Sequence, residues 1–526
     1  MRGWGLVQPE CVSATARDDA RRSYALNLVG LNLRQLRAYP EGQIHVMKTL
    51  RRLSLLSTAL VCSALPGITL AQAAPQAAPR TPSLMQPLAP PIDLKFDFSA
   101  GAAKPGTTRV APTAVYSDDA GYGYEPGAQV TNGDNGNTTT SEKPFMFSAK
   151  VPEGDFNVTV TFGDSTVATT TTFKAESGRL MLERVEVPAG KVAERSFTTN
   201  VRTPHLPKLP TNATGREEVS LDQFDGGSSR DWDNKLTVEV VSPHAALRSI
   251  EIVSAPTAPT VFIAGDSTVT DRDGGGDVSW GQVLSVFFKP GVAVANNGQS
   301  GETMKSFMNA LRLDKMLSQM KPGDYLFMQF IHNDSKASWP QTYVEPETTY
   351  KAYLKVYIAE ARLRGAIPVL VTAMDRGARG TGAPTHGHGG YPQSMREVAQ
   401  EEHVAFIDLY SMSDTVYQSA GADAGKILAD GTHSTAYGGY EFAKCIVMGI
   451  KQNKLDLAKY IVDGFKDFDP AHPDSAAALD LGPLFTSAGG GRGPRPGGPP
   501  PAGGPGAGPG AGSGAPPATN PGPGPL

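Results

Sequence analysis

Ser267, Asp430 and His433 are residues whose types and positions suit nucleophilic catalysis. Ser267 follows Gly265-Asp266 directly after a short apolar run, where a serine is exposed and can attack a substrate if a base lies beside it. Asp430 is close enough to His433 in the sequence for its carboxylate to reach one imidazole nitrogen while the other faces Ser267. Together they have the chemistry of a serine nucleophile, its general base and the acid that orients the base.

Two further motifs offer hydrogen-bond donors. Gly298 leaves its backbone N–H open to approach, and Asn333, in His332-Asn333-Asp334, has a side-chain amide that can donate. Each motif alone is weak evidence, because Gly-Asp-Ser is a common turn and an asparagine after a strand is usually a cap. Their joint occurrence at strand ends carries the weight of the interpretation.

The chain repeats two of these motifs elsewhere. Gly163-Asp164-Ser165-Thr166 lies between two runs of alternating polarity, where we expect a hairpin turn, and no helical pattern follows it. His472, in Asp469-Pro470-Ala471-His472, also has no helical pattern after it. Because Ser267 follows a strand and His433 precedes a helix, we prefer them to Ser165 and His472.

The elements around the candidate residues alternate between strands and helices after Pro256. Apolar runs that alternate with helical patterns predict a parallel sheet covered by helices on both faces, which binds ligands at the carboxyl ends of its strands. Residues 92–254 instead alternate between apolar and polar in short runs, which predicts an antiparallel β-sandwich ahead of an α/β domain at 258–485. The predicted strands of the α/β domain are 260–264, 292–295, 325–330, 367–372 and 404–409, and its predicted helices are 302–320, 347–364 and 436–450.

The two ends of the chain differ from its centre. Residues 47–73 have a basic start, an apolar run and small residues before a cleavage point after Ala73, which is the layout of a secretory signal. A membrane anchor is disfavoured, because the run is too short to span and Pro66 interrupts it. We predict an over-extended translation for 1–46, a signal peptide for 47–73, an Ala/Pro linker for 74–91 and a disordered Gly/Pro-rich tail for 486–526.

The composition excludes several classes of protein. Hydrophobic residues at 40% and charged residues at 19% exclude a wholly disordered chain, and a net charge of -4 gives no reason to expect nucleic-acid binding. The 3 cysteines are too few and too far apart for a disulfide scaffold or a thiolate zinc site. We expect Cys445, on the apolar side of a helix, to lie in the core.

The order of the four motifs resembles that of the SGNH (GDSL-type) hydrolases. Ala264-Gly265-Asp266-Ser267-Thr268, followed by Trp280-Gly281, is similar more narrowly to the rhamnogalacturonan acetylesterases. The resemblance covers about residues 260–452, and Ile331, where many relatives have glycine, leaves Asn333 in place. It implies a flavodoxin-like three-layer α/β domain with a parallel sheet, preceded by a β-sandwich similar to galactose-binding modules.

The resemblance also implies a mechanism. Ser267 would attack an acetyl carbonyl, His433 would take its proton and pass it to the sugar oxygen, and Asp430 would hold the imidazole. The oxyanion hole would consist of the Ser267 N–H, the Gly298 N–H and the Asn333 side chain, and no metal or cofactor would be needed.

The implied function is that of a secreted esterase, periplasmic or extracellular, that removes O-acetyl groups from plant cell-wall polysaccharide, above all from rhamnogalacturonan in pectin. The partner would be the acetylated polysaccharide, with no nucleic acid and no stable membrane insertion, and the protein would be a monomer. Two alternatives stay open: an esterase that acts on acetyl-xylan or a lipid, and a non-catalytic carbohydrate-binding protein.

Several other residues have two interpretations. A substrate-touching loop is favoured over a metal site for His386 and His388, because no acidic or thiol partner lies nearby. A solvated loop is favoured over a calcium site around Asp271, Asp273 and Asp277, whose spacing does not fit a calcium loop. Aromatic residues that either stack on sugars or belong to the core are Trp280, Trp339, Tyr343 and Tyr391. The candidate substrate contacts are His332, His386, His388, Tyr391 and Arg376, with Arg379 as a second candidate cation for an acidic substrate.

Overall fold

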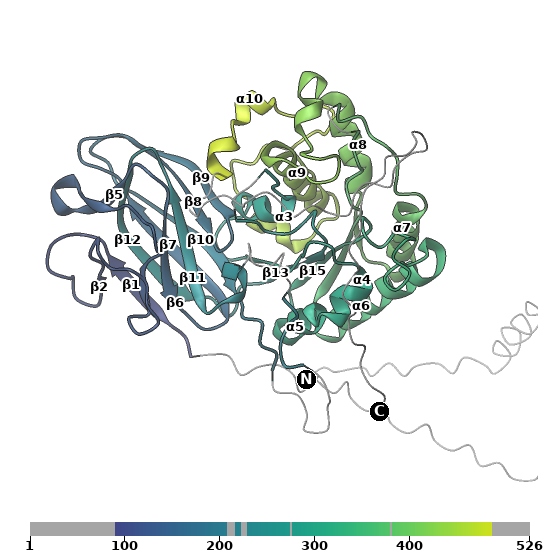
Figure 1. Ribbon diagram of the computed structural model, residues 1–526, viewed down its shortest axis with the longest axis horizontal. Helices are drawn as coiled ribbons and strands as arrows, with labels where there is room; N and C mark the ends of the chain where they lie inside the picture. The colour runs from purple at the N-terminus through teal and green to yellow at the C-terminus, as the bar shows by residue number, and fades with distance from the viewer. Residues whose placement is uncertain (1–89, 208–215, 222–228, 274–275, 379–380, 486–526) are drawn as a thin grey trace, which may run out of the picture. The chain divides into compact units, whose positions relative to one another are not determined.

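The computed structural model describes residues 90–207, 216–221, 229–273, 276–378 and 381–485 (Figure 1). The predicted segments 1–46, 47–73 and 486–526, nearly all of the linker 74–91, and Arg379 lie outside the described residues. The described residues belong to one compact unit that begins at Arg80. No helix among them is long and apolar enough to cross a membrane.

A five-stranded parallel sheet forms the centre of the region after residue 258 (Figure 1). Its strands are β13 (Thr260–Gly265), β14 (Ala293–Asn296), β15 (Tyr325–Gln329), β16 (Ile367–Val371) and β17 (Ala405–Ile407). Their order, β14-β13-β15-β16-β17, is that of flavodoxin-like sheets, in which ligands bind where the strand order reverses, next to the first strand. The predicted parallel sheet is confirmed, and the reversal lies at β13, directly before Ser267.

Helices cover both faces of this sheet. Because successive side chains of a strand point to opposite faces, each strand contributes to two apolar clusters. Val261 and Ile263 of β13 belong to one apolar cluster, and Phe262 and Ala264 belong to another. The helices that contribute to the first cluster are α3 (Trp280–Val283), α8 (Leu409–Ser419), α9 (Ala436–Gln452) and α10 (Ala476–Leu479). Those that contribute to the second are α4 (Met304–Asn309), α5 (Arg312–Gln319), α6 (Lys351–Leu363) and α7 (Tyr391–Glu402).

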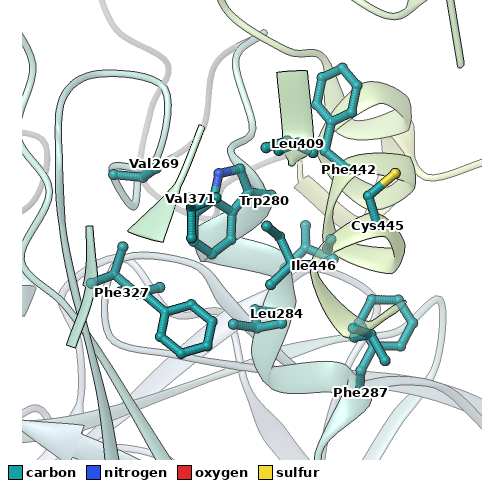
Figure 2. Packing of buried hydrophobic residues seen from close by; sticks show 14 of the residues in the cluster. Val269, Trp280, Leu284, Phe287, Phe327, Val371, Leu409, Phe442, Cys445 and Ile446 are labelled. Carbon is teal, nitrogen blue, oxygen red and sulfur yellow. The ribbon is translucent and has the colours of Figure 1, made fainter. Parts of the chain in front are cut away.

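The first cluster contains Trp280 and Cys445, as Figure 2 shows. Both side chains are 0% exposed, and the Trp280 indole donates to Gln329 Oε1 at 2.8 Å. Trp280 is therefore a core residue and not a platform for a sugar. Cys445 lies in the core, as we expected.

The predicted helix 302–320 is two helices, α4 and α5. Thr303 and Ser306 form a capping box at the start of α4. The break falls at Leu311, whose φ is 63°, and the preceding Ala310 carbonyl accepts a hydrogen bond from the Ser220 N–H at 2.9 Å. A tertiary contact that the local pattern does not encode therefore interrupts the helical run.

Two sheets built largely of antiparallel pairs enclose one apolar cluster in residues 93–254. The first contains β1 (Asp93–Asp97), β2 (Thr108–Arg109), β4 (Thr131–Gly133), β5 (Thr138–Ser141), β7 (Gly154–Phe162), β10 (Ala193–Val201) and β12 (Ala245–Ser254). The second contains β3 (Tyr122–Tyr124), β6 (Phe145–Lys150), β8 (Thr169–Ala175), β9 (Arg179–Val187) and β11 (Lys235–Val241). One pair, β1 with β2, is parallel. A relation of this sandwich to galactose-binding modules stays a prediction.

The repeat of the serine motif at 163–166 lies between β7 and β8. These strands belong to different sheets, so the segment crosses from one sheet to the other, and the predicted hairpin turn was wrong. The Ser165 hydroxyl donates to Asp134.

Candidate active site

Ser267 lies in a tight turn at the carboxyl end of β13. At Gly265 a Cβ would lie 2.5 Å from Val269 Cγ2, so a side chain there would displace the turn. The buried Asp266 carboxylate accepts hydrogen bonds from the Thr268 N–H at 2.9 Å and from its hydroxyl at 2.7 Å. The turn leaves Ser267 partly exposed at the end of the strand.

His433 connects Ser267 to Asp430. Its Nε2 lies 2.8 Å from Ser267 Oγ, and its Nδ1 lies 2.8 Å from Asp430 Oδ2. Asp430 Oδ1 accepts from the backbone N–H groups of Thr432 and His433 at 3.0 and 2.9 Å. Burial raises the pKa of Asp430, but these hydrogen bonds from His433 and Thr432 outweigh it and hold the pKa below its usual range. The imidazole is thus placed to take the serine proton while an ionised carboxylate orients it.

Two contacts fix the segment that carries His433. The Val278 N–H donates to the Ser434 carbonyl at 2.8 Å, and the Ser434 hydroxyl donates to the Val278 carbonyl at 2.7 Å. At Gly439, in the first turn of α9, a Cβ would lie 2.4 Å from the Val278 carbonyl oxygen. Glycine at this position therefore lets α9 approach the chain that leads from Ser267.

Gly298 and Asn333, the expected oxyanion donors, follow β14 and β15. The Gly298 N–H donates to Asn296 Oδ1 at 3.1 Å, and a Cβ at Gly298 would lie 2.5 Å from Val269 Cγ2. The buried Asn333 amide donates to the Glu302 carbonyl at 2.9 Å. Because an amide nitrogen carries two hydrogens, Asn333 keeps a second donor. The single hydrogen of the Gly298 N–H is engaged by Asn296, so this donor has to turn to an oxyanion or share its hydrogen with one. The role of both residues as oxyanion donors stays a prediction.

The model of the GDSL-like lipase/acylhydrolase family matches residues 263–439. The probable rhamnogalacturonan acetylesterase YesY of Bacillus subtilis (strain 168) is 36% identical over 210 residues, which cover 38% of this chain and 97% of YesY. The rhamnogalacturonan acetylesterase RhgT of the same organism is 33% identical over 221 residues, which cover 38% of this chain and 94% of RhgT. The chain belongs to the GDSL-like lipase/acylhydrolase family. As an SGNH-type member of it, the protein is a carboxylic ester hydrolase, and the resemblance of the four motifs is confirmed.

A third relative of this GDSL-like hydrolase matches a larger share of the chain. The uncharacterized esterase YxiM of Bacillus subtilis (strain 168) is 25% identical over 395 residues, which cover 70% of this chain and 93% of YxiM. The match is longer than that of the family model, so the likeness to YxiM includes residues outside 263–439.

The histidines expected to touch substrate occupy different environments in the GDSL-like hydrolase. His332 and His388 are each 2% exposed, and their rings lie 4.8 Å apart. His388 Nε2 lies 2.9 Å from the Met374 carbonyl, and burial lowers the pKa of this histidine to about 3. His386 has a side chain that is 61% exposed, beside Asp375 at 3.5 Å. Of the three side chains, His386 is therefore the one in reach of a large substrate.

Tyr391 and Arg376 also differ in access. Tyr391 begins α7 and is 5% exposed. Its hydroxyl donates to the Val344 carbonyl at 2.6 Å. This burial gives Tyr391 a packing role. The half-buried Arg376 donates to the His332 carbonyl at 3.1 Å and to the Thr432 hydroxyl, so its guanidinium lies between the Asn333 loop and the His433 loop.

Two cations at the site were missed in the sequence. Arg272 Nη2 donates to the Ser267 carbonyl at 2.7 Å, and Lys336 Nζ donates to Asn333 Oδ1 at 2.7 Å. Lys336 also lies 4.0 Å from the ring of Trp339, which is 38% exposed. The position of Lys336 three residues after Asn333, in the same turn, was a usable signal, whereas Arg272 reaches Ser267 only because the loop folds back.

The aspartates at 271–277 are not a solvated loop. Asp271 is 2% exposed and lies 3.0 Å from Arg179, while Asp273 lies 2.7 Å from Arg230. The prediction was wrong because arginines of the β-sandwich, distant in sequence, pair with these carboxylates. Within the described ranges no cluster of His, Cys, Asp or Glu is suited to hold a metal ion.

The repeated Asp-x-x-His motif reproduces one hydrogen bond of the site without its context. His472 Nδ1 lies 2.8 Å from Asp469 Oδ2, the same distance as between His433 and Asp430. The His472 side chain is 82% exposed. Exposure separates this pair from the one at Ser267, because the His433 side chain is only 18% exposed. The expectation that no helix follows His472 was wrong, since α10 begins at Ala476 after the cap residue Ser475.

Asp334 provides a pH-dependent prediction. Burial, with the nearby Asp266 and Glu302 charges, raises its pKa to about 8, although the Met304 N–H donates to it at 2.8 Å. Between about pH 4 and about pH 8 the folded state holds a proton that the unfolded state has lost, so stability falls as pH rises, by up to about 1.4 kcal/mol per pH unit.

We therefore expect Asp334→Asn to remove this loss, so that the variant gains stability relative to wild type between about pH 5 and about pH 8. Denaturant unfolding at both pH values measures the difference. Asp463→Asn, whose side chain is 89% exposed, is the control and should show no such trend. An Asp334→Asn difference that is the same at both pH values would contradict the assignment.

Proposed function

We propose that this hydrolase is a secreted serine esterase that removes O-acetyl groups from plant cell-wall polysaccharide, with rhamnogalacturonan as its substrate. The observation that carries the proposal is the continuous contact from Ser267 Oγ through His433 to Asp430, with 2.8 Å at each step. The substrate is supported by two relatives, at 36% and 33% identity, that are named as rhamnogalacturonan acetylesterases. Export is supported by the signal-like residues 47–73.

The proposed acetyl transfer uses the three side chains in turn. Ser267 Oγ attacks the acetyl carbonyl as His433 Nε2 takes its proton, and the same nitrogen returns that proton to the departing sugar oxygen. Water then gives a proton to His433, attacks the acetyl-serine and releases acetate, and His433 returns the proton to Ser267. Asn333 and the Gly298 segment would stabilise the oxyanion in both steps.

Acetate release from defined polysaccharides tests the substrate. We expect acetate from acetylated rhamnogalacturonan oligosaccharides, and little from acetylated xylan or a triglyceride. Faster release from acetylated xylan would show that the enzyme is a xylan esterase. Tight sugar binding without any ester turnover would show that the protein is a non-catalytic carbohydrate-binding protein.

Arg376 is a candidate contact for an acidic sugar. Removal of residues 1–73 would leave the chain more acidic, so a uronate needs a local cation. We expect Arg376→Ala to raise KM about tenfold for an acetylated fragment that carries a uronate, and to leave KM for 4-nitrophenyl acetate unchanged. Arg362→Ala, which replaces an exposed arginine paired with Glu402, is the control. An unchanged KM for the acidic fragment would contradict this role.

A further inference from the structure

Arg179 is a buried arginine of the β-sandwich that pairs with the nucleophile loop. It is the first residue of β9, and its side chain is 0% exposed. Its Nε and Nη2 atoms both lie 3.0 Å from Asp271 Oδ2. Further bonds to Thr199 at 3.2 Å and Asp231 at 3.4 Å hold the guanidinium within the sandwich.

Asp271 links Arg179 to the segment that contains Gly298. Its second oxygen, Oδ1, accepts from Asn296 Nδ2 at 2.7 Å. Asn296 Nδ2 also donates to the Val269 carbonyl, which fixes the orientation of the amide. As a result, Asn296 Oδ1 points to the Gly298 N–H at 3.1 Å. Three contacts therefore lead from a sandwich arginine to Gly298.

Residues 296–298 are also held by two arginines that pack on Trp232. The guanidinium of Arg202 lies 4.5 Å from the Trp232 ring and donates to the Asn296 carbonyl. The guanidinium of Arg312 lies 5.2 Å from the same ring, and its Nη1 donates to the Asn297 carbonyl at 3.5 Å. Both carbonyls that precede Gly298 thus accept from arginines that pack on one sandwich tryptophan.

The loop after Ser267 is held in the same way. Gln282 Nε2 donates to the Gly178 carbonyl of the sandwich at 3.1 Å and to the Arg272 carbonyl at 2.9 Å. The Arg272 guanidinium in turn donates to the Ser267 carbonyl at 2.7 Å. Burying such charges is costly, and apolar residues of similar volume often serve stability equally well. A positioning role explains why these polar groups are present.

We propose that the β-sandwich is a fixed part of the esterase site, and that Arg179 is a positioning residue that sets the Gly298 segment against Ser267 through Asp271 and Asn296. This inference rests on the proposed function, because it assigns Arg179 to the turnover of that same site. The sandwich then contributes to kcat and not only to substrate capture.

Arg179→Met tests the proposal in the full chain, with 4-nitrophenyl acetate as substrate and methylboronic acid as a tetrahedral mimic on Ser267. We expect kcat to fall about 10- to 100-fold with KM within about threefold of wild type, since oxyanion donors act in the transition state. The inhibition constant of the boronic acid should rise in parallel, and Arg179→Lys should recover part of the loss. The matched control is Lys174→Met, which breaks the buried Lys174–Glu239 pair (2.7 Å) of the same sandwich.

The control should unfold at a lower temperature and keep kcat within about threefold of wild type. A kcat and boronate constant close to wild type in Arg179→Met would overturn the proposal, and so would an equal kcat loss in Lys174→Met. If Arg179→Met does not fold, an unchanged kcat in Arg179→Lys overturns it. Turnover that persists in Ser267→Ala would instead contradict the proposed function, which requires Ser267 as the nucleophile.

Discussion

Replacing Ser267 with alanine is expected to lower kcat for 4-nitrophenyl acetate by on the order of 10⁵-fold or more, because the attacking oxygen is lost. The hydroxyl lies 2.8 Å from His433 Nε2, and the imidazole is itself held by Asp430. Residues that act as one unit have non-additive effects, so the double variant Ser267→Ala/His433→Ala should be no slower than Ser267→Ala alone. Steady-state rates, corrected for hydrolysis of the ester in buffer alone, measure both variants.

Ser165→Ala is the matched control for this variant. It removes the serine of the repeated Gly-Asp-Ser-Thr motif, whose hydroxyl donates to Asp134 in the β-sandwich. We expect wild-type kcat. Activity that survives in Ser267→Ala and disappears in Ser165→Ala would show that the nucleophile was assigned to the wrong copy of the motif.

Asn333→Ala is expected to have the second largest effect. Loss of one oxyanion donor typically lowers kcat about 100- to 1000-fold, with KM little changed, because the donor binds charge that develops only in the transition state. The amide is held by its bond to the Glu302 carbonyl at 2.9 Å and by Lys336 at 2.7 Å, so it is preorganised before substrate binds. Steady-state kinetics on the chromogenic ester separate kcat from KM.

Asn309→Ala provides the comparison for Asn333. Asn309 is an exposed asparagine at the end of α4, and its replacement should leave both constants unchanged. A fall in kcat of less than about threefold in Asn333→Ala would exclude this side chain from the oxyanion hole, since it is below the effect of a lost donor. A rise in KM alone would give Asn333 a role in substrate binding.

Local patterns sufficed for the parallel sheet and for the residues at its strand ends. Apolar runs mark buried strands, and loops that follow adjacent parallel strands meet at one edge, so Ser267, Gly298 and Asn333 could be grouped from the sequence. His433 could be added because its motif precedes a helix. The resemblance to a known family then gave these residues their roles.

Contacts between distant segments were beyond the reach of local patterns. The pairing of Asp271 with Arg179 joins residues far apart in the chain, and the same holds for the Ser220 contact at the break between α4 and α5. Burial of Tyr391 and His388 likewise depends on how α7 packs on its neighbours. Sequence periodicity reports the face that a residue occupies, whereas these pairings depend on the full tertiary fold.

The most direct measurement is the position of the acetyl group on the enzyme during turnover. Wild-type protein is quenched with acid while it hydrolyses 4-nitrophenyl acetate, and its peptides are mapped by mass spectrometry. The acetyl group should lie on Ser267, and none should form in Ser267→Ala. An acetyl group on another residue, or turnover by Ser267→Ala at the wild-type rate, would contradict the account.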